Sequence, residues 1–156
     1  MSIFQCIVRC LFRRPKPRYS YTFMAKAHYS GQTNFFPVYG NICVNPTTNT
    51  PSEDFIQYTV HSFTLTFDSN VINGNSGNLR FHQHSPGEYH NEGYSLTSND
   101  GTFHVGYDDA AQVNSMIFPT PPDFIDYANG GSGAYNDKLF SLNTVLLVKQ
   151  DCKICP

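Results

Sequence analysis

Apolar and polar residues alternate along most of the chain from Tyr19 onward, as they do in strands that turn one face to a core. Phe and Tyr supply the 15% of residues that are aromatic, and Gly, Asn, Pro, Ser and Thr fill the intervals between apolar runs. Strands favour aromatic and β-branched residues, whereas turns favour Gly, Asn and Pro. The pattern therefore predicts an all-β protein: an antiparallel, jelly-roll-like β-sandwich that forms a single domain over residues 19–156.

The segment from Phe55 to Phe67 contains a break in this alternation. Its apolar residues are Ile56, Tyr58 and Val60 in one phase and Phe63, Leu65 and Phe67 in the other. A change of phase inside one strand requires a bulge, or a crossing from one sheet to another. We therefore expect an irregular strand here.

Residues 94–107 predict a hairpin, because two alternating runs flank the pair Asp100-Gly101. That pair suits a type I′ turn, in which both central residues have positive φ. The expected cross-strand pairs are Leu96 with Val105 and Thr97 with His104.

Three other segments have local signals of their own. Residues 73–78, Asn-Gly-Asn-Ser-Gly-Asn, predict a turn. Residues 108–117 predict one short helix, because Asp108 or Asp109 can cap the apolar face that follows. The run from Leu139 to Val148 is apolar in both alternating sets, which is typical of a central strand covered on both sides.

The N-terminal region has a different pattern. Residues 2–14 place apolar side chains on one helical face and basic ones opposite, which predicts a short N-terminal amphipathic helix. Pro15 and Pro17 end that helix and leave an extended connector. We therefore treat residues 1–18 as a basic arm that precedes the β domain.

Charge is unevenly distributed between the arm and the rest. The first 26 residues hold six basic residues and no acidic one, whereas the remaining 130 hold four basic and twelve acidic ones, a net of 4 − 12 = −8. Such an arm suits a polyanion, either nucleic acid or an anionic membrane. The basic contact residues are Arg9, Arg13, Arg14, Lys16 and Arg18. On a membrane, the inserted residues would be Phe4, Ile7, Leu11 and Phe12.

Four histidines, His82, His84, His90 and His104, lie within 23 residues. His82 and His84 point to the same side of a strand, which is a natural two-ligand clamp for a divalent ion. His104 lies on the polar side of the expected hairpin and would be the third ligand. Histidines on a solvated strand face bind no metal in most proteins, so we expect no cofactor and keep zinc at His82, His84 and His104 as the alternative.

The string Phe81-His82-Gln83-His84-Ser85-Pro86-Gly87-Glu88 resembles the zinc-ligand strand of the bacterial-type α-carbonic anhydrases, and Thr120-Pro121-Pro122 resembles a second fragment of that family. The resemblance implies an enzyme in which His82, His84 and His104 hold zinc and activate a bound water.

Five cysteines, an odd number, without a secretory signal favour a reduced, intracellular setting. Cys6, Cys10, Cys152 and Cys155 lie near the two ends of the chain, which are often close together in space, and could form a structural zinc site. Alternatively, Cys6 and Cys10 belong to the apolar face of the N-terminal helix or are palmitoylated. Cys152 and Cys155 would then lie on a short C-terminal tail without a zinc ion. Cys43 is expected to be buried.

These observations favour assembly or binding over catalysis. No complete catalytic motif is present, and only 14% of the residues are charged, which protects a surface poorly against self-association. The concrete version is a coat or minor capsid protein that binds copies of itself, through loops such as 35–37 and 118–122. The alternatives are a metal-dependent enzyme and a peripheral membrane protein. An intracellular or virion location is expected, with no secretory signal and no transmembrane helix.

Overall fold

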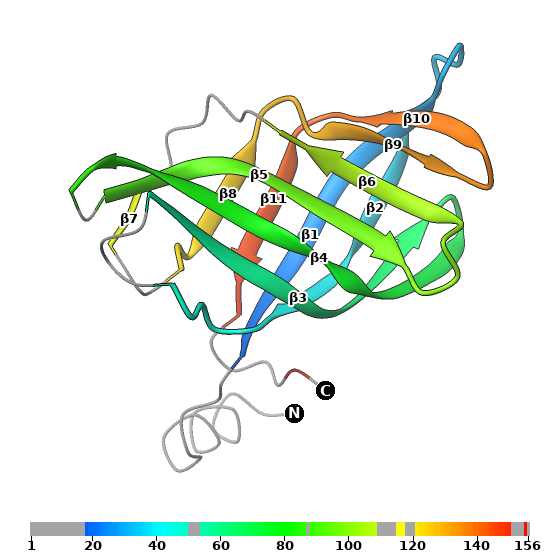
Figure 1. The fold of residues 1–156 in the computed structure, drawn as a ribbon. Helices are drawn as coiled ribbons and strands as arrows, with labels where there is room; N and C mark the ends of the chain where they lie inside the picture. The colour runs from blue at the N-terminus through cyan, green and yellow to red at the C-terminus, as the bar shows by residue number, and fades with distance from the viewer. Residues whose placement is uncertain are drawn as a thin grey trace, which may run out of the picture.

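The computed structural model describes residues 18–49, 54–86, 88–108, 115–117, 121–150 and 155, and these contain strands but no helix. The strands are β1 (Tyr19–Tyr29), β2 (Phe36–Val44), β3 (Phe55–Phe67), β4 (Asn70–Ser85), β5 (Glu88–Ser98), β6 (Phe103–Tyr107), β7 (Ser115–Ile117), β8 (Phe124–Tyr127), β9 (Gly131–Tyr135), β10 (Lys138–Leu142) and β11 (Val145–Lys149) (Figure 1). The all-β class is confirmed. The expected N-terminal helix lies outside the described residues.

Eight strands close into an antiparallel barrel rather than dividing into the two sheets of a sandwich or jelly roll. Their order is β1-β2-β3-β4-β5-β6-β9-β10, and β10 pairs again with β1 through Ala27 and Leu142 (Figure 1). The sandwich prediction was wrong because alternation alone does not say whether the last strand returns to the first. An eight-stranded barrel has an interior that side chains can just fill.

The remaining strands extend the barrel at one end. β11 pairs with residues 21–24 of β1, on the same edge that β10 occupies further along, and β8 pairs with β11. β7 pairs with the start of β5. A hydrogen bond of 3.2 Å from the Tyr127 hydroxyl to the Gly93 carbonyl links β8 to β5 without a strand pairing.

Aromatic side chains fill the interior, since the inward positions of the strands are mostly apolar. Tyr21, Phe23, Phe67, Phe103 and Phe140 are all at most 1% exposed. Phe67 is central at one end, where its ring centroid lies 4.6 Å from that of Phe140 and 5.3 Å from that of Phe103. Rings at such distances add stabilisation beyond the area that they bury.

The expected irregularity in β3 is confirmed. Cys43 of β2 pairs with Ser62, but its neighbour Val44 pairs with Val60, so His61 is an extra residue in β3. The buried set accordingly changes from Ile56, Tyr58 and Val60 to Phe63, Leu65 and Phe67. A bulge of this kind bends the strand and lets it follow the barrel wall.

The run from Leu139 to Val148 is two strands, so the prediction of one central strand was wrong. Both strands lie along β1, but their registers differ by one residue: Ala27 pairs with Leu142, whereas Met24 pairs with Leu146. The register changes at Asn143 and Thr144. The buried residues are therefore 140 and 142 in β10 but 145 and 147 in β11. Both alternating sets are apolar because each faces the core along a different strand.

The 94–107 hairpin forms in the predicted register, with Leu96 opposite Val105 and Thr97 opposite His104. Its turn type was wrong, since only Gly101 of the pair has a positive φ. Turns with two consecutive positive φ values occur instead at Asp68-Ser69 and at Asn136-Asp137. These are the β3–β4 and β9–β10 connections, and neither contains glycine.

Residues 73–78 belong to β4, so the turn predicted there was wrong. Gly77 has a φ of +149°, and a Cβ on it would lie 2.0 Å from the Ser95 carbonyl oxygen. Glycine is needed at this position for close approach between strands. The helix predicted over residues 108–117 was wrong at its end, where Ser115–Ile117 form β7, and residues 109–114 lie outside the described part.

Candidate functional sites

The structure separates one of the three histidines predicted to bind metal, His104, from the other two, which both lie on β4. His82 of β4 pairs with His90 of β5, with 6.2 Å between the ring centroids. His104 of β6 pairs with Thr97, which is seven residues from His90 along β5, or roughly 23 Å at the rise of a strand. The structure therefore brings His82 to His90 and not to His104. The side chain of His84 lies outside the described residues.

The His82–His90 pair has an acidic neighbour. Nε2 of His90 lies 3.3 Å from Oε1 of Glu88, and the hydroxyl of Ser85 donates to Oε2 of the same carboxylate at 2.9 Å. Even so, no group of three or more His, Cys, Asp or Glu side chains among the described residues is arranged to hold a metal ion. Zinc at the histidines therefore stays a sequence prediction without support from this arrangement.

The cysteines form a link that the sequence analysis missed. Cys43, near the end of β2, and Cys155 form a disulfide with 5.7 Å between their Cα atoms. A disulfide sulfur has no thiolate to offer zinc, so the predicted four-cysteine site lacks a ligand while Cys155 is oxidised. The other three cysteines of that prediction, Cys6, Cys10 and Cys152, lie outside the described residues. An odd cysteine count gave no sign of which two would pair.

β1 begins at the end that also holds this disulfide, since Ser20 pairs with Cys43; we call it the terminal end (Figure 1). Of the predicted arm contacts, only Arg18 is described, and its Nε donates to Oδ1 of Asn45 at 3.3 Å. The others, Arg9, Arg13, Arg14, Lys16 and the apolar Phe4, Ile7, Leu11 and Phe12, lie outside the described residues.

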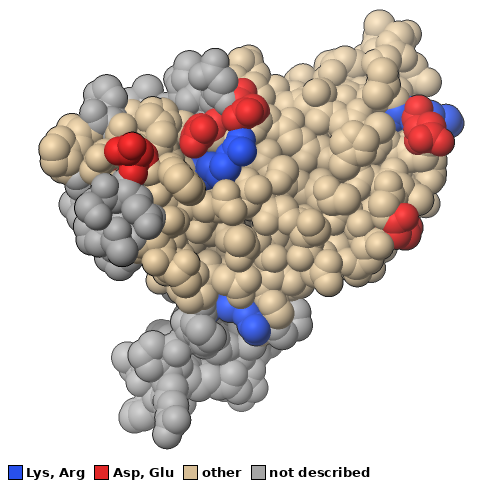
Figure 2. Space-filling view, in the orientation of Figure 1, with Lys and Arg blue, Asp and Glu red and all other residues tan. Residues whose placement is uncertain are grey.

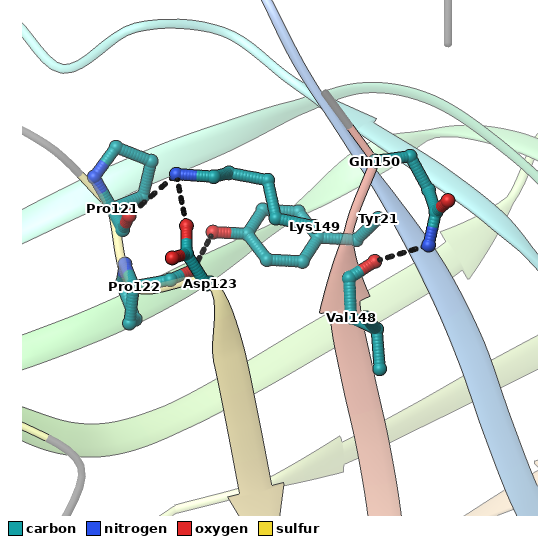
Figure 3. A network of polar contacts seen from close by, with 7 residues as sticks. All are labelled: Tyr21, Pro121, Pro122, Asp123, Val148, Lys149 and Gln150. Atoms are coloured by element: carbon teal, nitrogen blue, oxygen red, sulfur yellow. Dashed lines mark hydrogen bonds and ion pairs between the residues drawn. The ribbon is translucent and has the colours of Figure 1, made fainter. Parts of the chain in front are cut away.

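A polar network ties the start of β8 to the terminal end. Nζ of Lys149 lies 2.7 Å from Oδ1 of Asp123 and donates to the Pro121 carbonyl oxygen at 3.2 Å (Figure 3). The Tyr21 hydroxyl donates to the Pro122 carbonyl oxygen at 2.8 Å. Burial raises the pKa of Tyr21, so its hydroxyl keeps the proton that it donates. The prolines of the carbonic-anhydrase-like fragment thus have structural contacts here.

Charged side chains are sparse on the barrel surface. On the face shown in Figure 2 they occupy a few separate positions, and most of the surface between them is uncharged. Some of the described basic side chains are also paired, as Arg80 is with Asp108 at 2.6 Å. Association between copies would therefore depend on the uncharged surface, because residues 27–156 carry a net charge of 4 − 12 = −8 and like barrels repel one another.

An uncharged row crosses four adjacent strands on the outside of the barrel. Met24 pairs with Tyr39, Tyr39 with Thr66, and Thr66 with Val71. Met24, Tyr39 and Val71 are 41%, 51% and 65% exposed. We call these four residues the outer row. The sequence analysis did not single out these residues, and their alignment depends on strand register.

The opposite end of the barrel, the rim, contains an open hollow of about 690 Å³. The β1–β2 loop, the β3–β4 turn and the start of β10 all contribute to it. From the aromatic loop 35–37 that the sequence analysis singled out, Phe35 is 52% exposed in the hollow, whereas Phe36 is half-buried against Phe67. The other predicted contact loop, 118–122, is described only at Pro121 and Pro122.

A helix with the length and hydropathy needed to cross a membrane is absent from the described residues. Comparisons with protein-family models, with curated proteins and with solved structures gave no match for this chain.

Proposed function

We propose that this protein acts by assembly, with copies of the barrel associating through the outer row while the arm binds a polyanion. The observation that carries the proposal is the outer row itself, in which three exposed apolar side chains and Thr66 align across four neighbouring strands, because exposed apolar patches mark interaction surfaces. A coat or minor capsid protein of a virus is the concrete version. Scattered single apolar residues would need no such account.

The charge distribution supports a division of labour between arm and barrel. The arm contributes positive charge without any acidic residue. It joins β1 at the terminal end, which is opposite the rim (Figure 1). A barrel with a net negative charge would repel phosphate, so contact with nucleic acid would depend on the arm. Neutralising phosphates in this way is independent of base sequence and sensitive to salt.

The assembly part is tested by placing a charge in the outer row. Light scattering and analytical ultracentrifugation over a concentration series should show a defined oligomer or particle for the wild type. Tyr39→Glu should shift the series to monomer, because a buried unpaired carboxylate at an interface is costly. Thr97→Glu, an exposed position away from the row, is the matched control and should leave association unchanged. A wild type that is monomeric throughout the series would overturn the proposal.

The arm part is tested by deleting residues 1–17, which keeps Arg18 and its bond to Asn45. The truncated protein should fold and associate but lose binding to nucleic acid. Wild-type affinity should fall steeply as salt is raised and should not depend on Phe4 or Leu11. Dependence on those apolar residues, with binding to anionic vesicles, would instead indicate the membrane alternative.

A further inference from the structure

The floor of the rim hollow is held in place before any ligand arrives. The Tyr29 hydroxyl donates to Oδ2 of Asp68 at 2.8 Å, and Nζ of Lys138 lies 5.8 Å from the centre of the Tyr29 ring. Burial and this hydrogen bond raise the pKa of Tyr29 to about 12, so the hydroxyl remains a donor. The ring also packs against Phe36 and Phe67 at centroid distances of 5.5 and 6.1 Å.

The β1–β2 loop that forms one wall is also anchored. The backbone N–H of Ser30 donates to the Leu139 carbonyl at 2.9 Å, and the N–H of Gln32 donates to the Tyr29 carbonyl at 3.0 Å. Phe35 lies against His28, with 4.8 Å between ring centroids. Little ordering of the wall would be needed on binding, which favours affinity.

Two amide side chains that face the hollow are unused by the fold. Gln32 and Asn34 are exposed, and among the described contacts their side-chain amides make no hydrogen bond. Each amide offers donors and an acceptor. Phe35 and Leu139, at 52% and 63% exposed, supply an apolar surface beside them. The hollow thus combines an aromatic face with free neutral donors and acceptors.

The charge of the hollow selects against ions. Its lining holds one acid, Asp68, and one base, Lys138, which cancel. A phosphate or sulfate would be attracted by Lys138 and repelled by Asp68, so the lining gives an anion no net attraction. A purely apolar ligand would displace water from the amides without replacing its hydrogen bonds. A pyranose ring has an apolar C–H face that can lie on an aromatic ring, and hydroxyl edges that both donate and accept. We propose that the rim hollow binds a neutral saccharide, which stacks on Phe35 and hydrogen-bonds to Gln32 and Asn34.

Ligand-observed saturation-transfer NMR tests this directly with neutral probes: the methyl glycosides and short oligomers of glucose, galactose, mannose and N-acetylglucosamine. At least one should receive saturation at millimolar concentration. Phe35→Ala should abolish the transfer, and Gln32→Ala with Asn34→Ala should reduce it at least several-fold. Phe35→Tyr should retain it, because an aromatic face remains.

Phe124→Ala is the matched control, since Phe124 is 46% exposed on β8, away from the rim. Thermal unfolding of each variant shows whether the barrel is intact. The measurements use dilute protein in a single oligomeric state, so that the saccharide result does not depend on whether copies of the protein associate. The inference is overturned if no neutral probe receives saturation, if Phe35→Ala leaves the transfer unchanged, or if sialylated and sulfated saccharides or a mononucleotide bind better than the neutral ones.

Discussion

The rim and the terminal end of the barrel are held together by different interactions. At the rim, Phe67 packs in one cluster with Phe36, Phe103, Tyr135 and Phe140, and apolar contact dominates. At the terminal end, an ion pair links Lys149 of β11 to Asp123, and a hydrogen bond links Tyr21 of β1 to Pro122 (Figure 3). A disulfide links Cys43 of β2 to Cys155 at the same end. Packing of the first kind changes little with salt or redox state, whereas interactions of the second kind respond to both.

This difference has a consequence for the arm. The arm is attached to the end whose stability depends on solution conditions, whereas the proposed saccharide site lies at the other end. Reduction or high salt should therefore loosen the end of the barrel where the arm joins before it alters the rim. Four changes, taken from the largest expected effect to the smallest, test this contrast.

Phe67→Ala should cost about 3–5 kcal/mol of the free energy of unfolding, because it removes a fully buried ring at the centre of the rim cluster. Urea unfolding followed by tyrosine fluorescence measures the loss. Phe55→Ala, at a position 48% exposed, should change stability by less than about 0.5 kcal/mol. Similar small losses in both variants would show that the cluster does not stabilise the rim.

Cys155→Ser should cost about 2–4 kcal/mol under oxidising conditions, because the disulfide joins residues 112 apart in the sequence and restricts the unfolded chain. A reducing agent should lower the urea midpoint of the wild type and leave that of Cys155→Ser unchanged. The three cysteines outside the described residues are present in both proteins and serve as the internal control. Equal sensitivity of the two proteins to reduction would contradict the link.

Lys149→Met should cost about 1 kcal/mol, since it removes an ion pair whose lysine is 12% exposed but whose Asp123 is 88% exposed. Asp123 remains solvated, so no buried charge is left behind. Added salt should reduce the difference in the free energy of unfolding between wild type and variant, because salt screens the ion pair. Lys138→Met, at the exposed rim, is the control and should change stability less. If the variant is as stable as the wild type at low salt, the ion pair does not stabilise the terminal end.

Sequence reasoning succeeded where a signal is local. The change of phase in β3 and the register of the β5–β6 hairpin follow from neighbouring residues, because alternation fixes which face each residue occupies. It failed where the outcome depends on distant partners. Closure of the barrel requires Ala27 to pair with Leu142, and the disulfide requires Cys43 to lie beside Cys155. No local sequence pattern predicts either pairing.

Turn chemistry misled for a related reason. Asn and Gly in residues 73–78 favour turns in isolation, but tertiary structure used the glycines there for close strand approach. Asp68 and Ser69 adopt positive φ because a two-residue hairpin connection requires it. The candidate surfaces were predictable only in part: Phe35 was singled out from its loop, whereas the outer row and the hollow around Tyr29 exist only once the strands are in register.

The smallest expected effect is a response of the rim to acid. Oδ1 of Asp100 accepts hydrogen bonds from the Ser98 hydroxyl at 2.7 Å and from the Thr102 N–H and hydroxyl at 3.0 and 2.7 Å. Together these bonds lower the pKa of Asp100 from its ordinary 3.8 to about 2. The folded chain therefore favours the ionised carboxylate more than the unfolded chain does.

The stability that Asp100 contributes should be complete above the ordinary value and should decline as the pH falls from 3.8 towards 2, since the unfolded chain takes up the proton first. Asp100→Asn should flatten this part of the curve of urea midpoint against pH. Asp137→Asn, at the exposed β9–β10 turn, is the matched control and should leave the slope unchanged. If wild type and Asp100→Asn lose stability in parallel, the turn does not hold the carboxylate in its ionised form. The acid response would then belong to other carboxylates.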